Sequence, residues 1–397
     1  MKDIAQKISA IVERDKEEIV KFIRDFIAIE SVTYQEKAAI DFLAAKMNDF
    51  GYEEVRIDAV GNVLGRVGSG KTVVVYDAHI DTVEPGEAKD WGFDPLKGKY
   101  ENGIIYGRGA VDDKGCLGGL AYAGKVLKEL SLTGDFTLWV SGSLAEEDVE
   151  GSAVNEMLKV NADIKPDFIL VGEASGLRIV RGHKGRAMVK VTVPGKPAHA
   201  SSAYKGINSL SKALPILEGI DKMNDFAEDE FLGKGTFEIT SCVSETLSLN
   251  TIPGKTVLHA DRRISCGESI SDILGEIKEW TDGANAVAEI GEERYKTYTG
   301  YEVVAEDYFP SWVMPMDSKI VQAGIETFKT LFEKEPVVGR WDFCTNATSL
   351  CGRTGIPALG FGPGDESLCH SLDDQLPVSE LVEAIKFYTL FPLIVSK

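Results

Sequence analysis

The chain has 397 residues, which exceeds the size at which one hydrophobic core usually divides, so we expect two domains. Its 43 lysines and arginines against 63 aspartates and glutamates give a formal net charge of −20, which disfavours binding to nucleic acids and to anionic membranes. No segment is apolar enough for a membrane span or a secretory signal, so we predict a cytoplasmic location.

Helical and strand patterns alternate through the first 170 residues. Apolar residues at helical spacing predict helices over about 4–27 and 35–50. The run 73–76, Val-Val-Val-Tyr, has no polar alternation, as expected of a strand buried on both faces. Further helices and strands are predicted in turn over segments that begin near 113, 135, 151 and 167. This alternation is typical of an α/β fold with a mostly parallel sheet.

The pattern changes in the middle of the chain. There the expected order is strand, helix, strand, strand, helix, strand, which is that of a ferredoxin-like unit. Alternation of helix and strand resumes from Asp317. We therefore predict a catalytic α/β domain formed by residues 1–178 and 295–397, with residues 179–294 as a smaller inserted domain.

Five short segments place histidines and carboxylates at the ends of predicted strands or in loops. Open α/β sheets bind their ligands at the carboxyl ends of the strands. Singly, each segment has a structural explanation, such as a helix cap or a solvated acidic loop. Together they supply two histidines and three or four carboxylates, a ligand set that suits zinc or manganese. The segments contain His79 and Asp81, Asp112 and Asp113, Glu146 and Glu147, Glu173, and His370.

In two of these segments, neighbouring residues are expected to have different roles at the site. In an extended segment His79 and Asp81 point to the same face, so Asp81 can orient the imidazole toward a metal. The adjacent carboxylates of Glu146 and Glu147 repel each other, which raises the pKa of one of them unless a cation is bound. A metal on one carboxylate leaves the other free to act as a base.

In order and spacing, and with Trp91 following His79-x-Asp81, the segments resemble the aminoacylase family of co-catalytic zinc peptidases. This family includes acetylornithine deacetylase, succinyl-diaminopimelate desuccinylase and bacterial glutamate carboxypeptidases. The resemblance implies hydrolysis of an amide bond in a small N-acyl amino acid or a dipeptide-like substrate. It also implies two divalent metal ions, with zinc expected and cobalt or manganese as alternatives.

Residue roles follow from the same resemblance. Asp112 would bridge the two metals, and the peptide bond after it would be cis. Glu146 would be the general base and Asp81 the partner of the metal-binding imidazole. The remaining ligands would be His79 and Glu173 at one metal, and Glu147 and His370 at the other.

The inserted domain carries the second half of the resemblance, which implies a lid that also forms a homodimer. His199, in Gly-Lys-Pro-Ala-His, would reach the substrate carbonyl of the partner subunit, although a histidine packed in a turn is the alternative. Asn250 begins an Asn-Thr-Ile-Pro-Gly turn that matches the family and is assigned to substrate binding. The substrate carboxylate would be held by Arg263, with Arg262 left open.

Two other functions are compatible with the sequence. The same fold can hydrolyse an N-carbamoyl or ureido group, which would release ammonia and carbon dioxide. A catalytically inactive relative could serve as a binding module, but the complete ligand set argues against it. The segment 340–346, Arg-Trp-Asp-Phe-Cys-Thr-Asn, departs from the family pattern near the substrate pocket and leaves the side-chain preference open.

Overall fold

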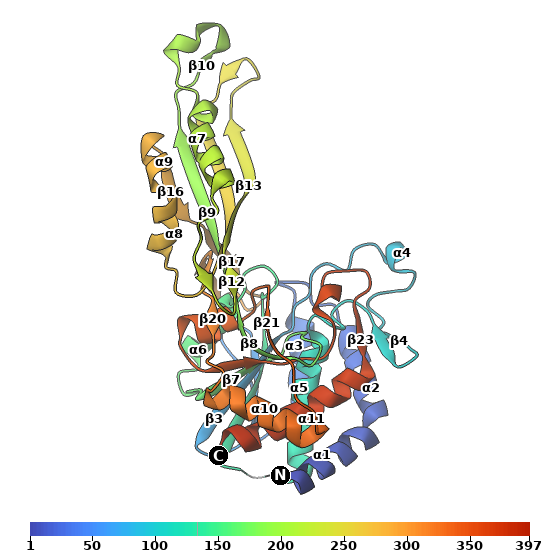
Figure 1. The fold of residues 1–397 in the computed structure, drawn as a ribbon. Helices are drawn as coiled ribbons and strands as arrows, with labels where there is room; N and C mark the ends of the chain where they lie inside the picture. The colour runs from blue at the N-terminus through green and yellow to red at the C-terminus, as the bar shows by residue number, and fades with distance from the viewer. Residues whose placement is uncertain (133) are drawn as a thin grey trace.

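Two β-sheets of different size organise the chain, and a computed structural model describes it over residues 1–132 and 134–397 (Figure 1). The larger sheet belongs to the lower body of Figure 1, and the second sheet lies in an arm that projects away from it. The arm is the inserted domain that the sequence predicts. Both chain termini lie at the end of the body opposite the arm.

The larger sheet has parallel strands at its centre and antiparallel strands toward one edge. Strands β6, β3, β7 and β22 are parallel neighbours in that order, whereas β1, β2 and β6 pair in an antiparallel manner. The other edge holds β8 with β20 and β21. The strands span Glu54–Ile57 (β1), Val63–Gly68 (β2), Thr72–His79 (β3), Phe136–Ser143 (β6), Phe168–Val171 (β7), Ile179–His183 (β8), Trp312–Val313 (β20), Val338–Trp341 (β21) and Ala358–Gly360 (β22).

Strand β3 is buried on both faces, as its uninterrupted apolar run predicts. Val74 and Tyr76 point into the larger core, which the long helices complete, and Val75 points into the smaller core on the other face. Helix α6 and the turn η2 contribute to the smaller core. The helices are Lys2–Arg14 (α1), Lys16–Ile27 (α2), Lys37–Asp49 (α3), Lys114–Glu129 (α5), Ser152–Val160 (α6), Lys319–Phe332 (α10) and Val378–Val395 (α11), and η2 spans Thr348–Arg353.

The single helix predicted over 4–27 is wrong, because the chain breaks at Asp15 between α1 and α2. The buried Asp15 carboxylate accepts hydrogen bonds from Tyr122 Oη at 3.0 Å and Lys125 Nζ at 3.3 Å, both on α5. This tertiary contact holds the break. The apolar spacing continues on either side of it, so the periodicity does not reveal it.

The inserted domain has the predicted β-α-β-β-α-β order. Its antiparallel sheet runs β13-β15-β9-β16, and the short β19 joins the other end of β9. Helices α7, α8 and α9 cover one face of this sheet. The elements span Gly185–Pro194 (β9), Ser209–Lys222 (α7), Thr236–Glu245 (β13), Lys255–Ile264 (β15), Ile270–Glu276 (α8), Lys278–Gly283 (α9), Val287–Ile290 (β16) and Tyr308–Phe309 (β19).

The chain changes sheets later than the predicted boundary at residue 179. Residues 179–183 form β8 of the larger sheet, and β9 begins at Gly185. His183, which lies within the range predicted for the inserted domain, therefore belongs to the larger sheet. The composition is strand-like on both sides of Lys184, so no pattern in the sequence marks the change.

None of the helices in the described residues is long and apolar enough to cross a membrane.

Short elements complete the fold. The short elements are Ala88–Trp91 (α4), Lys99–Glu101 (β4), Ile104–Tyr106 (β5), Ala198–His199 (β10), Ala200–Lys205 (η1), Glu228–Asp229 (β11), Gly233–Lys234 (β12), Thr251–Ile252 (β14), Glu292–Lys296 (β17), Glu302–Glu306 (β18), Glu366–Leu368 (η3) and Gln375–Pro377 (β23).

His183 is a buried titratable group at the base of the inserted domain. Its Nδ1 lies 2.7 Å from the carbonyl oxygen of Lys184, and its ring packs edge-on against Trp312. Its Nε2 is buried and has no hydrogen-bond partner among the described residues. The carbonyl therefore requires a proton on Nδ1, and a second proton on Nε2 would be unpartnered. Burial accordingly lowers the pKa of His183 from 6.5 to about 4.

We predict that His183 makes the protein lose stability as the pH falls from about 6.5 to about 4. Below its ordinary pKa the unfolded histidine takes up a proton that the folded one does not, so the loss reaches on the order of 3 kcal/mol. Chemical denaturation across this range should show a shallower pH dependence for His183→Phe than for the wild-type protein. Equal slopes for the two proteins would contradict the assignment.

Candidate metal centre

The predicted site residues gather at one edge of the larger sheet. Strands β6, β3 and β7 are parallel neighbours, so their carboxyl ends meet there. His79 is the last residue of β3, Glu146 and Glu147 follow β6, and Glu173 follows β7. Three segments that are far apart in the sequence thus supply side chains to one place.

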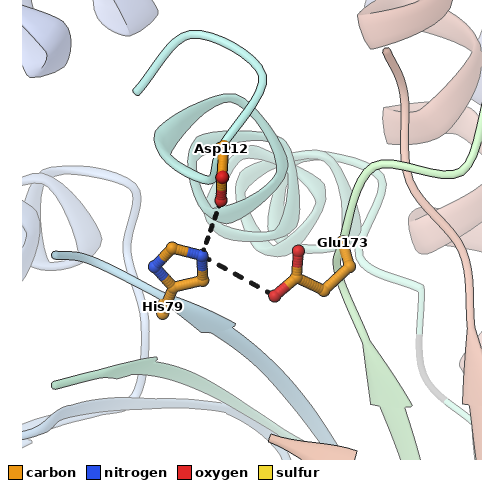
Figure 2. Close-up of side chains that lie close together, drawn as sticks. All are labelled: His79, Asp112 and Glu173. Carbon is orange, nitrogen blue, oxygen red and sulfur yellow. Dashed lines mark hydrogen bonds and ion pairs between the residues drawn. The ribbon is translucent and has the colours of Figure 1, made fainter. Parts of the chain in front are cut away.

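His79, Asp112 and Glu173 form the first group (Figure 2). The Nε2 atom of His79 lies 2.9 Å from Oδ1 of Asp112 and 3.6 Å from Oε1 of Glu173. One nitrogen or oxygen atom from each side chain lies within 4.8 Å of the others. All three residues are buried, so their charges are poorly solvated.

Asp112, Glu147 and His370 form the second group. The Nε2 atom of His370 lies 3.3 Å from Oδ2 of Asp112 and 2.7 Å from Oε2 of Glu147. His370 is on the exposed side of the cavity, in the loop that follows η3. Asp112 therefore directs one carboxylate oxygen at each group, which is the arrangement that a bridging ligand requires.

Asp81 connects the loops that carry the two groups. Its carboxylate accepts hydrogen bonds from the backbone nitrogens of Glu146 at 3.1 Å and Glu147 at 3.2 Å, and from Thr33 Oγ1 at 2.8 Å. The Nδ1 atom of His79 lies 3.0 Å from the carbonyl oxygen of Asp81 and 3.5 Å from its carboxylate. The shorter contact lets the carbonyl hold the Nδ1 proton, so Nε2, which faces Asp112, would be the atom offered to a metal ion.

A tight loop positions Asp112 at the start of α5. The peptide bond between Asp112 and Asp113 is cis, as the resemblance implies. The carboxylate of Asp374 accepts hydrogen bonds from the backbone nitrogens of Gly109 at 2.7 Å and Val111 at 2.8 Å. Asp113 occupies the N-cap position of α5 without a capping hydrogen bond from its side chain. Sequence reasoning assigns no role to Asp374, although it stands only four residues after His370.

The charges of this cluster favour bound cations. Burial raises the pKa values of the Glu146 and Glu173 carboxyl groups, and the neighbouring carboxylates raise them further. Hydrogen bonds to Asp112 and Glu147 raise the pKa of His370 to about 10. The cluster thus holds positive charge strongly, and two divalent ions would replace the protons. The nitrogen and oxygen donors present fit such ions.

A cavity of about 310 Å³ opens above the cluster. Side chains from both ligand groups line this cavity. The expected base Glu146 and Arg263 of the inserted domain line it as well. Sequence reasoning missed Glu150, although it stands only four residues after Glu146 in the same loop. The cavity is lined by Asp112, Glu146, Glu147, Glu150, Glu173, Arg263, Phe343, Cys344, Glu366, Cys369 and His370.

The two adjacent arginines of β15 point to opposite faces of the inserted sheet. Arg262 is fully buried on the helix-covered face, where its guanidinium pairs with Glu276 at 2.7 Å and also with Glu268. Arg263 is on the open face and lines the cavity. Strand alternation therefore brings Arg263, and not Arg262, to the candidate site.

Strand β10, which ends at His199, lies at the tip of the arm, far from the body (Figure 1), and Asn250 contacts His199 there. They are exposed neighbours, with Nε2 of His199 3.3 Å from Nδ2 of Asn250, and the short strands β10 and β14 pair there. Within one chain the structure does not bring either residue to the metal groups.

A family model described as peptidase family M20/M25/M40 matches residues 75–393. The chain belongs to peptidase family M20/M25/M40. The matched segment contains all five expected metal ligands. Membership confirms the predicted family and the prediction of a metal-dependent hydrolase.

Similar proteins match this sequence over almost the whole chain. The chain is 35% identical over 389 residues to the uncharacterized protein YgeY of Escherichia coli K12, with 96% of each chain covered. It is 26% identical over 388 residues to succinyl-diaminopimelate desuccinylase of Afipia carboxidovorans, covering 92% of this chain and 96% of that one.

Solved structures of M20-type enzymes share the fold. The aminopeptidase PepT of Bacillus cereus superposes with a TM-score of 0.75 at 22% identity, covering 96% of this chain and 99% of that one. The dipeptidase Dug1p of Saccharomyces cerevisiae superposes with a TM-score of 0.72 at 15% identity, covering 100% and 99%. These likenesses confirm the predicted α/β architecture with an inserted domain.

We predict that Asp112→Ala abolishes binding of both metal ions, because each group loses its shared ligand. Glu173→Ala should weaken one site and leave the other. Metal content after dialysis, measured by plasma mass spectrometry, checks both expectations, with Asp373→Asn as a control in an exposed carboxylate of the His370 loop. Retention of two ions by the Asp112 variant would exclude a bridging role.

Proposed function

We propose that this M20-family chain uses two divalent metal ions to hydrolyse the amide bond of an N-acyl amino acid or a dipeptide-like substrate. The observation that carries the proposal is the position of Asp112, with one carboxylate oxygen toward each ligand group. His79 and Glu173 would complete one site, and Glu147 and His370 the other. We propose zinc because imidazole and carboxylate ligands suit it, with cobalt or manganese as substitutes.

Glu146 is proposed as the general base and acid. Two ions held by these ligands would supply Lewis acidity, which would acidify a water molecule and polarise the amide carbonyl. Glu146 lines the cavity but belongs to neither ligand group. Its carboxylate accepts the proton of the attacking water as the carbon–oxygen bond forms. It then donates that proton to the amide nitrogen as the carbon–nitrogen bond breaks.

The inserted domain is proposed to form a homodimer and to supply His199 and Asn250 to the partner's cavity. Their distance from their own cluster supports this proposal, because neither could act within one chain as it stands (Figure 1). The arm also exposes large apolar side chains that a second subunit would cover. These include Tyr204, Ile207, Leu214, Val243, Leu247 and Leu249.

We also propose that the protein is cytoplasmic. The six cysteines are all free thiols, which is typical of proteins in a reducing compartment. Three of them, Cys116, Cys344 and Cys351, are buried.

The proposed reaction is tested by a substrate screen with the zinc-loaded protein. N-acetyl, N-succinyl and N-carbamoyl amino acids and dipeptides should be compared by release of the free amino acid. The proposal requires turnover of an N-acyl amino acid or a dipeptide. Turnover of N-carbamoyl substrates alone, with release of ammonia, would instead establish the ureido-hydrolase alternative, and turnover of none would favour a binding module.

We predict that Glu146→Gln retains both metal ions and loses about 10²- to 10⁴-fold in kcat, since proton transfer is removed without a change in the ligands. Steady-state kinetics and metal analysis of the same preparation measure the two effects. Full activity would refute the assignment of the base.

We predict that His199→Ala is inactive with its metals in place and that mixing it with Glu146→Gln restores activity. Each hybrid dimer would contain one cavity with an intact Glu146 and an intact His199 from the other subunit. Random exchange at equal amounts should therefore give roughly a quarter of wild-type activity. The subunits of the two variants are exchanged by dilution and reconcentration. If exchange is measured but activity does not recover, His199 has no role in the partner's site.

A further inference from the structure

Two arginines stand directly opposite each other on the open face of the inserted sheet. Arg186 of β9 and Arg263 of β15 are register partners in an antiparallel pair. Side chains of opposed residues lie on the same face with Cβ atoms about 5 Å apart, and like charges in such pairs are destabilising. An anion is therefore needed beside them.

Carboxylates from two parts of the chain accompany the pair. Glu150, in the loop after β6, places Oε2 2.9 Å from Nη2 of Arg186. Asp261, two residues before Arg263 on the same strand, places Oδ1 2.8 Å from its Nε. Glu150 also lines the metal cavity together with Arg263. The catalytic domain thus supplies one of the two anions that the inserted sheet requires.

Both guanidinium groups have hydrogen-bonding capacity to spare. Among the described residues, Arg186 donates to Glu150 alone, and Arg263 donates twice to Asp261. Each guanidinium has five N–H donors. Arg186 is further fixed by stacking on Phe309, 4.8 Å from the ring centroid, and its Nε is buried without a partner. The pair is held in place with more donors than the protein's own acceptors use.

Arg263 is already expected to hold the substrate carboxylate; we propose that Arg186 is a second arginine of that site, and that Glu150 is the protein's own carboxylate competing for the pair. This inference rests on the proposed function and adds two residues that would set its affinity for the substrate carboxylate. Paired arginines suit a carboxylate because their forked donors match its two oxygens. Glu150 keeps Arg186 oriented before substrate binds and limits affinity for the substrate carboxylate afterwards.

A purely structural bridge between the two domains gives a different expectation. If Glu150 and Arg186 only joined the domains, loss of either partner would impair ligand binding in the same direction. If Glu150 competes with the ligand, removal of its charge strengthens carboxylate binding, whereas removal of the Arg186 charge weakens it. The signs of the two effects therefore distinguish the two roles.

The test measures ligand binding without turnover, in zinc-loaded Glu146→Gln protein. Isothermal titration with N-acetyl-leucine and with its primary carboxamide reports the contribution of the carboxylate. We expect added Arg186→Gln to weaken binding of the carboxylate on the order of tenfold, and added Glu150→Gln to strengthen it several-fold. Binding of the carboxamide should stay unchanged in both.

Lys190→Gln is the matched control, because Lys190 lies on the same strand and pairs with Glu289 at 3.0 Å outside the cavity. If Arg186→Gln does not fold, Arg186→Lys should give a smaller loss, since it keeps the charge without the fork. Shifts of the same sign in the Glu150 and Arg186 variants, or equal shifts for carboxylate and carboxamide, would overturn the paired-arginine site. Failure of the proposed function is seen separately, as no hydrolysis by wild-type protein.

Discussion

Asp112 presents its two carboxylate oxygens to two different imidazoles, and the rest of the site is arranged around that division. His79 reaches one oxygen from the end of a central strand, and His370 reaches the other from a loop almost 300 residues later in the chain. The loop before α5 must therefore be held rigidly, which the backbone hydrogen bonds to Asp374 achieve. Burial of so many carboxylates is unfavourable without cations, and this supports the proposed metal centre over a structural ion-pair network.

The inserted domain contributes one arginine to the lining of the cavity above this cluster. Strand alternation turns Arg262 into the helix-covered core and Arg263 toward the cavity, so one residue of register decides which arginine can meet a substrate. The same face carries Arg186, whose partner Glu150 comes from the catalytic domain. The boundary between the domains is thereby part of the cavity, and movement of the arm would change the electrostatics of substrate binding.

Much of the chemistry could be predicted from the sequence, because ligands at the ends of buried strands occur in short local segments. The grouping of His79, Asp112 and Glu173, and of Asp112, Glu147 and His370, agrees with those segments. The break at Asp15 could not be predicted, since it depends on a contact with α5. The change of sheet at Lys184 was misplaced because both flanking strands have similar composition. Glu150 was missed because its partner is more than 30 residues away.

The shared carboxylate of Asp112 is tested most directly by crystallography of the zinc-loaded protein with anomalous scattering. The account predicts two anomalous peaks in the cavity, one beside His79 and Glu173 and the other beside Glu147 and His370, with Asp112 between them. Two metals bridged by one carboxylate should lie roughly 3.5–4 Å apart. A single peak, or two peaks that do not share Asp112, would contradict it.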